Sequence, residues 1–123
     1  MDGYPAGRRG ARTLLETELA EAERALTTSA GNRSLCEIGA SRQSAPSAKH
    51  WEGAVSALAE TRRRARRDGV PDSPEQLLRV ALSLQDRWRT RASEMGPAGA
   101  DWAAYFRGGI EALDRLAEVL RGC

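Results

Sequence analysis

The chain is 123 residues long, and 41% of these residues are hydrophobic while 29% are charged. This length and balance predict one globular domain with its own core and exclude an intrinsically disordered chain. The net charge of +2 does not by itself favour a nucleic-acid partner. No apolar run approaches the roughly 18 residues that cross a bilayer, so no membrane contact is expected.

Residues 1–11 combine glycine, arginine and proline without periodicity, and this pattern predicts a flexible tail. The first helix is predicted at 12–28, where apolar residues recur at the spacing of one helix face. That stripe consists of Leu15, Leu19, Ala22 and Leu26. Four glutamates in the same segment make this helix acidic.

Residues 29–47 form a long connector in which serine, glycine and alanine surround a short apolar island. A loop of this length inside a compact bundle is commonly functional or disordered. We interpret it as a polar connector that Leu35 and Ile38 pin to the core. A flexible loop that binds a partner is the alternative.

A second helix is predicted at 48–68, with Ser47 as its N-cap and Gly69 as its C-terminal stop. Its stripe gives way to arginine after three turns. The stripe runs through Trp51, Val55, Leu58, Arg62 and Ala65.

A third helix is predicted at 73–95, because Ser73, Pro74 and Gln76 form the pattern of a capping box and Gly96-Pro97 ends the segment. Its stripe has nearly heptad spacing. The stripe consists of Leu77, Ala81, Leu84, Trp88, Ala92 and Met95.

A fourth helix is predicted at 101–121, with Asp101 as its N-cap. Gly109 lies on its core side and is expected to let another helix approach closely. The apolar stripe consists of Trp102, Phe106, Ile110, Leu113, Ala117 and Leu120, flanked by Tyr105 and Leu116.

These elements predict an all-α fold, a compact antiparallel bundle of four helices that forms a single domain over residues 12–123 after the flexible tail. Because the aromatic residues fall on or beside the apolar stripes, we expect them in the core rather than exposed for stacking on bases. Tyr105 is the aromatic residue most expected to be partly exposed.

Basic residues are almost all arginine: of the 19, only Lys49 is a lysine. Abundant alanine and glycine accompany them, and the codons of all three residues are GC-rich, which predicts a GC-rich bacterium or phage as the source. Each arginine therefore carries less functional weight than it otherwise would.

The densest cluster of positive charge lies at the end of the second predicted helix, where five arginines occur between positions 62 and 67. Guanidinium groups bind phosphates in pairs of hydrogen bonds, and release of counterions drives binding to polyanions. The alternative is a solvated helix end, in which the cations complement the helix dipole and pair with Glu60 and Asp68. The cluster consists of Arg62, Arg63, Arg64, Arg66 and Arg67.

A second basic group surrounds Trp88 on the third predicted helix and consists of Arg87, Arg89 and Arg91. If this helix packs antiparallel to the second, the two groups lie at opposite ends of the bundle. Such an arrangement favours contacts spread along an extended ligand over one compact phosphate site.

Catalytic chemistry is not expected. His50 is the only histidine, and no second histidine, cysteine pair or acidic partner stands at the spacing of a zinc or di-iron site. No triad orients His50 as a general base. We therefore expect no enzyme activity, no metal and no cofactor.

The sequence favours a non-catalytic, cytoplasmic protein that binds a nucleic-acid backbone through the two arginine groups. It would act as a small subunit or accessory of a nucleoprotein or phage-related assembly. The alternative is a protein–protein interaction or assembly module, either a homo-oligomer or an adaptor, without nucleic-acid contact. In the homo-oligomer, the acidic first helix of one copy would meet the basic second helix of another.

Overall fold

The computed structural model describes residues 10–30, 46–95 and 99–122. Most of the expected tail and of the expected connector, including Leu35 and Ile38, lies outside these described residues. The described residues form four helices and no strand, so the predicted all-α bundle is confirmed. The helices are α1 (Ala11–Ala30), α3 (Pro46–Arg67), α4 (Pro74–Met95) and α5 (Ala100–Arg121).

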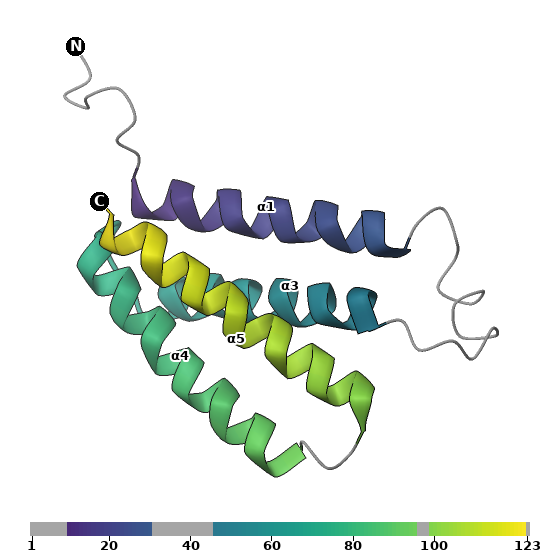
Figure 1. Cartoon of the computed structure of the whole chain (residues 1–123). Helices are drawn as coiled ribbons and strands as arrows, with labels where there is room; N and C mark the ends of the chain where they lie inside the picture. The colour runs from purple at the N-terminus through teal and green to yellow at the C-terminus, as the bar shows by residue number, and fades with distance from the viewer. Residues whose placement is uncertain (1–9, 31–45, 96–98, 123) are drawn as a thin grey trace.

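The chain runs back and forth, so that α1 lies antiparallel to α3, and α4 lies antiparallel to α5 (Figure 1). The helices α3 and α4 follow each other through a short turn, yet they touch much less than either touches α5. One end of the bundle therefore gathers the start of α1, the end of α3, the start of α4 and the end of α5, at the left of Figure 1.

Glycines allow α5 to come close to two other helices. A Cβ atom at Gly53 of α3 would overlap the carbonyl oxygen of Tyr105, and one at Gly108 of α5 would overlap the carbonyl oxygen of His50. Gly109 faces the indole ring of Trp88 in the same way. At Gly109 the group that approaches closely is thus a side chain of α4. At Gly53 and Gly108 it is the backbone of the neighbouring helix.

The buried face of α3 is rotated from the predicted stripe. Its fully buried side chains are Ala54, Ala57, Leu58 and Thr61, whereas Trp51, Val55 and Ala65 lie at the edge of the core. The reason is the close approach of α5, which leaves room only for small residues on the facing side of α3.

Three polar side chains in the core have hydrogen-bond partners. The hydroxyl of Thr61 donates to the carbonyl of Ala57 at 2.8 Å. The amide of Gln85 donates to the carbonyl of Ile110 at 3.1 Å, and the indole N–H of Trp88 donates to Glu60 at 3.0 Å. Because unsatisfied buried donors are costly, the bonds of Gln85 and Trp88 help to fix α4 against α5 and α3, whereas the bond of Thr61 lies within α3.

The structure corrects three predicted helix boundaries. The helix α3 begins at Pro46, so Ser47 is not its N-cap, and a proline at the first helical position needs no amide partner. The helix α5 begins at Ala100 after Gly99, which places Asp101 inside the first turn without a side-chain cap. Ala11, assigned to the tail, is helical and fully buried.

The predicted serine cap of α4 is confirmed, but the backbone amide of Ser73 donates to the carbonyl of Pro71 at 2.8 Å rather than to the side chain of Gln76. The amide of Gln76 donates to the hydroxyl oxygen of Ser73 at 3.3 Å, as a capping serine requires. The serine hydroxyl then donates to the carboxylate of Glu75 at 3.0 Å.

Two residues of the predicted core stripes lie at the surface. Trp102 is 45% exposed and Met95 is 39% exposed. They occupy the first turn of α5 and the last turn of α4, at the end of the bundle opposite the end of α3 (Figure 1). Tyr105, expected to be partly exposed, is intermediate in burial. None of the helices in the described ranges is both long and apolar enough to cross a membrane.

Candidate functional site

The arginines at the end of α3 point in several directions, because successive residues of an α-helix are about 100° apart. Arg62 faces α1 and pairs with Glu16 at 2.9 Å. Arg64 and Arg67 both pair with Asp68, at 3.6 and 3.2 Å. The acidic partner expected at Glu60 is instead engaged by Trp88.

Arg63 and Arg66 are exposed and form no ion pair or hydrogen bond with any described residue. Of the five arginines in the predicted cluster, these two have guanidinium groups free to meet a ligand. The helix dipole at the end of α3 favours positive charge at this position, so the cations are stable there without a protein partner.

An open cavity of about 390 Å³ lies at the end of the bundle, between α1, α3 and the turn that leads to α4. Its charged lining consists of Arg12, Glu16, Arg62 and Arg66. Its remaining lining is the turn Gly69, Val70 and Pro71 together with Leu15, Ala65 and Leu77. The cavity therefore combines three guanidinium groups with an apolar wall, and we call it the basic cavity.

Asp72 holds the start of α1 against this cavity. Its carboxylate accepts a hydrogen bond from the backbone amide of Arg12 at 2.8 Å, so a residue of the turn caps α1 from a distance. The side chain of Arg12 donates to the carbonyl of Val70 at 3.4 Å. These two bonds place the guanidinium of Arg12 beside those of Arg62 and Arg66.

Two guanidinium nitrogens near this end are buried without a hydrogen-bond partner among the described residues, namely Nε of Arg62 and one terminal nitrogen of Arg64. A buried donor without an acceptor costs about 1–3 kcal/mol. The ion pairs of Arg62 and Arg64 therefore satisfy these side chains only in part.

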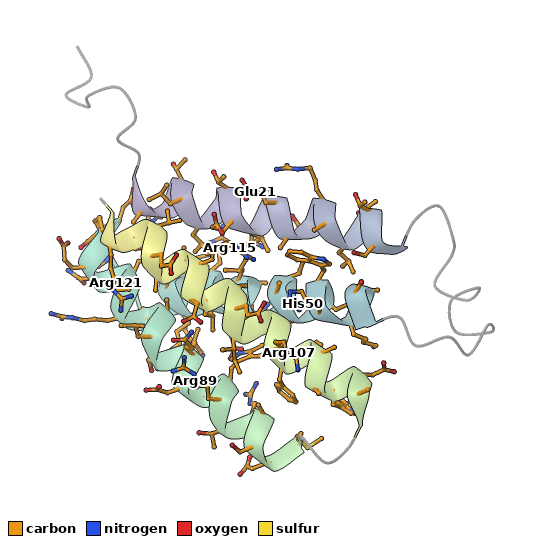
Figure 2. All side chains as sticks on the ribbon, viewed as in Figure 1. Glu21, His50, Arg89, Arg107, Arg115 and Arg121 are labelled. Atoms are coloured by element: carbon orange, nitrogen blue, oxygen red, sulfur yellow. The ribbon has the colours of Figure 1, made fainter. Side chains whose placement is uncertain are left out.

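The second arginine group lies along α4. Arg87 and Arg91 are exposed and, within the described ranges, unpaired, and they border a shallow hollow with Asp86 and Thr90. Arg89 lies 3.9 Å from Asp114 of α5, between the two helices (Figure 2). Arg87 is roughly 20 Å along the helix axis from the first residue of α4, at about 1.5 Å per residue. The structure thus brings Arg12 to Arg62 and Arg66, and leaves the α4 group apart.

His50 takes part in a chain of contacts between helices. Its Nε2 lies 3.7 Å from Glu111 of α5. Arg115 lies between α1 and α5 (Figure 2), where it pairs with Glu18 at 3.5 Å and stands 5.9 Å from the ring centre of Trp51. Glu111 and Arg115 therefore join α5 to α3 and α1.

Glu18 is mostly buried in this interface. Burial raises the pKa of its carboxyl, the negative charge of Glu21 raises it further, and Arg115 opposes both effects. No group of three or more potential metal ligands gathers within the described residues.

A hollow of about 330 Å³ lies next to the exposed Trp102 at the opposite end of α5. The indole of Trp102 stacks on Phe106 with ring centres 5.8 Å apart, and its outer face stays open. The other lining residues of this hollow are Lys49, Glu52, Asp101 and Tyr105.

Sequence reasoning did not place Arg12 and Glu16 in one cavity with Arg62 and Arg66, although the sequence held a signal for it. Antiparallel packing of α1 on α3 brings the beginning of the first helix beside the end of the second, and thus Arg12 beside Arg66. No family model, no curated protein and no solved structure matches this chain.

Proposed function

We propose that the protein binds the sugar–phosphate backbone of nucleic acid without catalysing a reaction. The observation that carries this proposal is the exposed, unpaired state of the side chains of Arg63 and Arg66, of which Arg66 lines the basic cavity. Exposed, unpaired guanidinium groups can neutralise phosphates and so release the cations that are condensed on the nucleic acid. Arg12, which reaches the same cavity from α1, adds a third cation at this end.

The α4 group extends the proposed contact. Arg87 and Arg91 are the free cations of that group, and they lie one helical turn apart. A separation of roughly 20 Å from the turn after α3 corresponds to about six phosphates of one duplex strand, at about 3.4 Å of helix axis each. Such spacing supports contacts with an extended ligand, and the protein would serve as a small cytoplasmic subunit or accessory of a nucleoprotein or phage-related assembly.

The proposal is tested by fluorescence anisotropy with single- and double-stranded DNA and RNA over a range of salt concentrations. We expect affinity that falls steeply as salt rises, with little dependence on base sequence. Absence of binding at low salt would refute the proposal, and so would equal binding after Arg63 and Arg66 are both changed to alanine.

A second candidate is a protein–protein interaction or assembly module, and the exposed Trp102 favours it. Tryptophan is enriched at the centres of interfaces, and here it borders a hollow. The charge difference between helices does not favour self-assembly, because Glu16 and Glu18 find arginine partners within the same chain. If the chain self-assembles through Trp102, light scattering should show an oligomer that Trp102→Ala converts to a monomer.

A further inference from the structure

We propose that the basic cavity binds a phosphate monoester carried by a nucleotide, and that its source is the phosphorylated end of a nucleic-acid strand. This inference rests on the proposed function and names what one part of the surface recognises. It concerns Arg12, Arg62 and Arg66, which line the cavity, and not the arginines of α4.

The charge of the lining matches a monoester better than a diester. Three guanidinium groups and the carboxylate of Glu16 give a net charge of +2, from three positive charges and one negative. A phosphate monoester carries about −1.5 to −2 near neutral pH and offers three strong acceptor oxygens. A diester within a strand carries a single negative charge and leaves part of this lining unmatched.

The size of the cavity also suits a single nucleotide. It is bounded by α1, by α3 and by the turn Gly69 to Pro71. Cavities of about 300–1,000 Å³ are the usual size for small-molecule sites, and this one falls within that range.

The apolar wall gives the sugar and base a surface to contact. The accessible part of this wall comes from Ala65 of α3 and from Val70 and Pro71 of the turn, whereas Leu15 and Leu77 behind them are each only 2% exposed. A site with positive charge and an apolar wall suits a nucleotide better than inorganic phosphate, because only the nucleotide buries apolar area as it binds.

Glu16 competes with the ligand for Arg62. The two side chains pair at 2.9 Å, and the carboxylate lines the same cavity that the phosphate would enter. Loss of this carboxylate would free the terminal nitrogens of Arg62 and remove a repulsive charge. The wild-type cavity is therefore expected to bind less tightly than a variant with glutamine at this position.

The first experiment compares short oligonucleotides of one sequence that carry a 5′-phosphate, a 3′-phosphate or only hydroxyl ends, each about ten nucleotides long. We expect at least one phosphorylated end to raise affinity about tenfold or more over the hydroxyl form. Arg66→Ala and Arg12→Ala should abolish this advantage, whereas the double variant Arg87→Ala/Arg91→Ala should keep it. Equal affinity of all three oligonucleotides, or an advantage that survives Arg66→Ala, would overturn the inference.

Arg66→Lys separates charge from geometry. Lysine keeps the positive charge but lacks the planar fork that binds two phosphate oxygens at once. In Arg66→Lys, we expect the affinity gained from a phosphorylated end to be smaller than in the wild type and larger than in Arg66→Ala. Circular dichroism should show unchanged folding, because Arg66 is exposed and has no partner among the described residues.

The second experiment compares Glu16→Gln with Glu21→Gln, which makes the same change of charge on the same helix. Glu21 is exposed on α1 (Figure 2) and is not among the residues that line the basic cavity. Glu16→Gln should raise the advantage of the phosphorylated strand, and Glu21→Gln should leave it unchanged. An equal effect of the two variants would show a general electrostatic response and would overturn the inference.

A titration with adenosine 5′-monophosphate, with adenosine as control, separates this inference from the proposed function. Salt-sensitive binding of all strands without any preference for a phosphorylated end overturns the inference and leaves the proposed function standing. Binding of the monophosphate that Arg66→Ala abolishes, without binding of any strand, supports the cavity as a nucleotide site and refutes the strand as its source and the proposed function with it.

Discussion

The double substitution Arg63→Ala/Arg66→Ala should flatten the salt dependence of nucleic-acid binding. Both residues are exposed on the last two turns of α3, and neither forms an ion pair with a described residue. Their removal therefore deletes ligand contacts without leaving an unpaired carboxylate in the protein. The same is not true of Arg62, whose loss would leave Glu16 without its partner.

The expected magnitude follows from the number of phosphates released. Each neutralised phosphate of duplex DNA contributes about −0.9 to the slope of the logarithm of the binding constant against the logarithm of salt concentration. Loss of two contacts should thus reduce the steepness of this slope by about 1.8. Near 0.1 M salt the same loss corresponds to affinity weaker by about 60-fold.

Anisotropy titrations of a labelled duplex at several salt concentrations measure this slope directly. The matched control is Arg24→Ala/Arg107→Ala, which removes two other exposed arginines, from α1 and from α5, and so changes the net charge equally. Neither of these residues lines the basic cavity. A slope that changes equally in both double variants would refute the reasoning, because net charge rather than position would then govern binding.

Three further predictions concern stability. Gly108→Ala should lower the free energy of unfolding by about 1–3 kcal/mol in urea titrations, because the added Cβ meets the backbone of His50. Helix propensity alone predicts the opposite sign, and Gly122→Ala, whose Cβ would make only ordinary contacts, should show no such loss. Burial raises the pKa of Glu18 above 4.5, so the stability that this group contributes is present below pH 4.5 and is lost as pH rises through the raised folded value. Thermal melts of the wild type and Glu18→Gln should therefore diverge above about pH 4.5, the wild type becoming relatively less stable. The carboxylate of Glu75 accepts hydrogen bonds from its own backbone amide and from the hydroxyl of Ser73, and both lower its pKa. The stability that Glu75 contributes to the folded state is therefore present above pH 4.5 and is lost as pH falls. Melts of Glu75→Gln should then differ from the wild type mainly at neutral pH and converge with it in acid.

The periodic stripes predicted the helices well, because each helix buries one face along most of its length. The stripe of α4 from Leu77 to Trp88 is buried as expected, and so is the stripe of α1 from Leu15 to Ala22. Prediction failed where tertiary packing decides the outcome. Trp102 has the spacing of a core residue, yet it lies in the first turn of α5 and is 45% exposed.

The arrangement of the helices was not predictable from their order. Short connections favour contact between consecutive helices, but α5 approaches both α3 and α4 more closely than these two approach each other. That outcome depends on Gly53 and Gly108 facing backbone across the same contact. Gly53 occupies an ordinary position in a helix, and nothing in its local sequence marks it as the partner of a residue in another helix.

The sequence predicted the position of the candidate site but not the contacts that distant residues make within it. Arginine content located the end of α3, because a run of like charges is visible in one dimension. The pairing of Arg62 depends on Glu16, which lies far away in sequence, whereas Asp68 pairs with Arg64 and Arg67 from an adjacent position. The cap that Asp72 provides to α1, which brings Arg12 to the cavity, likewise joins residues distant in the chain.

The interpretation of a solvated helix end fits three of the five arginines in the run. Arg62, Arg64 and Arg67 pair with acidic neighbours, as the interpretation of a solvated helix end requires. The C-terminal end of a helix carries only about half a negative charge. The two positive charges of Arg63 and Arg66 together exceed it. Their mutual repulsion is relieved when an anion binds, and a ligand that binds only the folded chain stabilises it. A polyanion should therefore raise the melting temperature of the wild type, and this gain should be lost in the Arg63→Ala/Arg66→Ala variant if these two residues provide the binding surface.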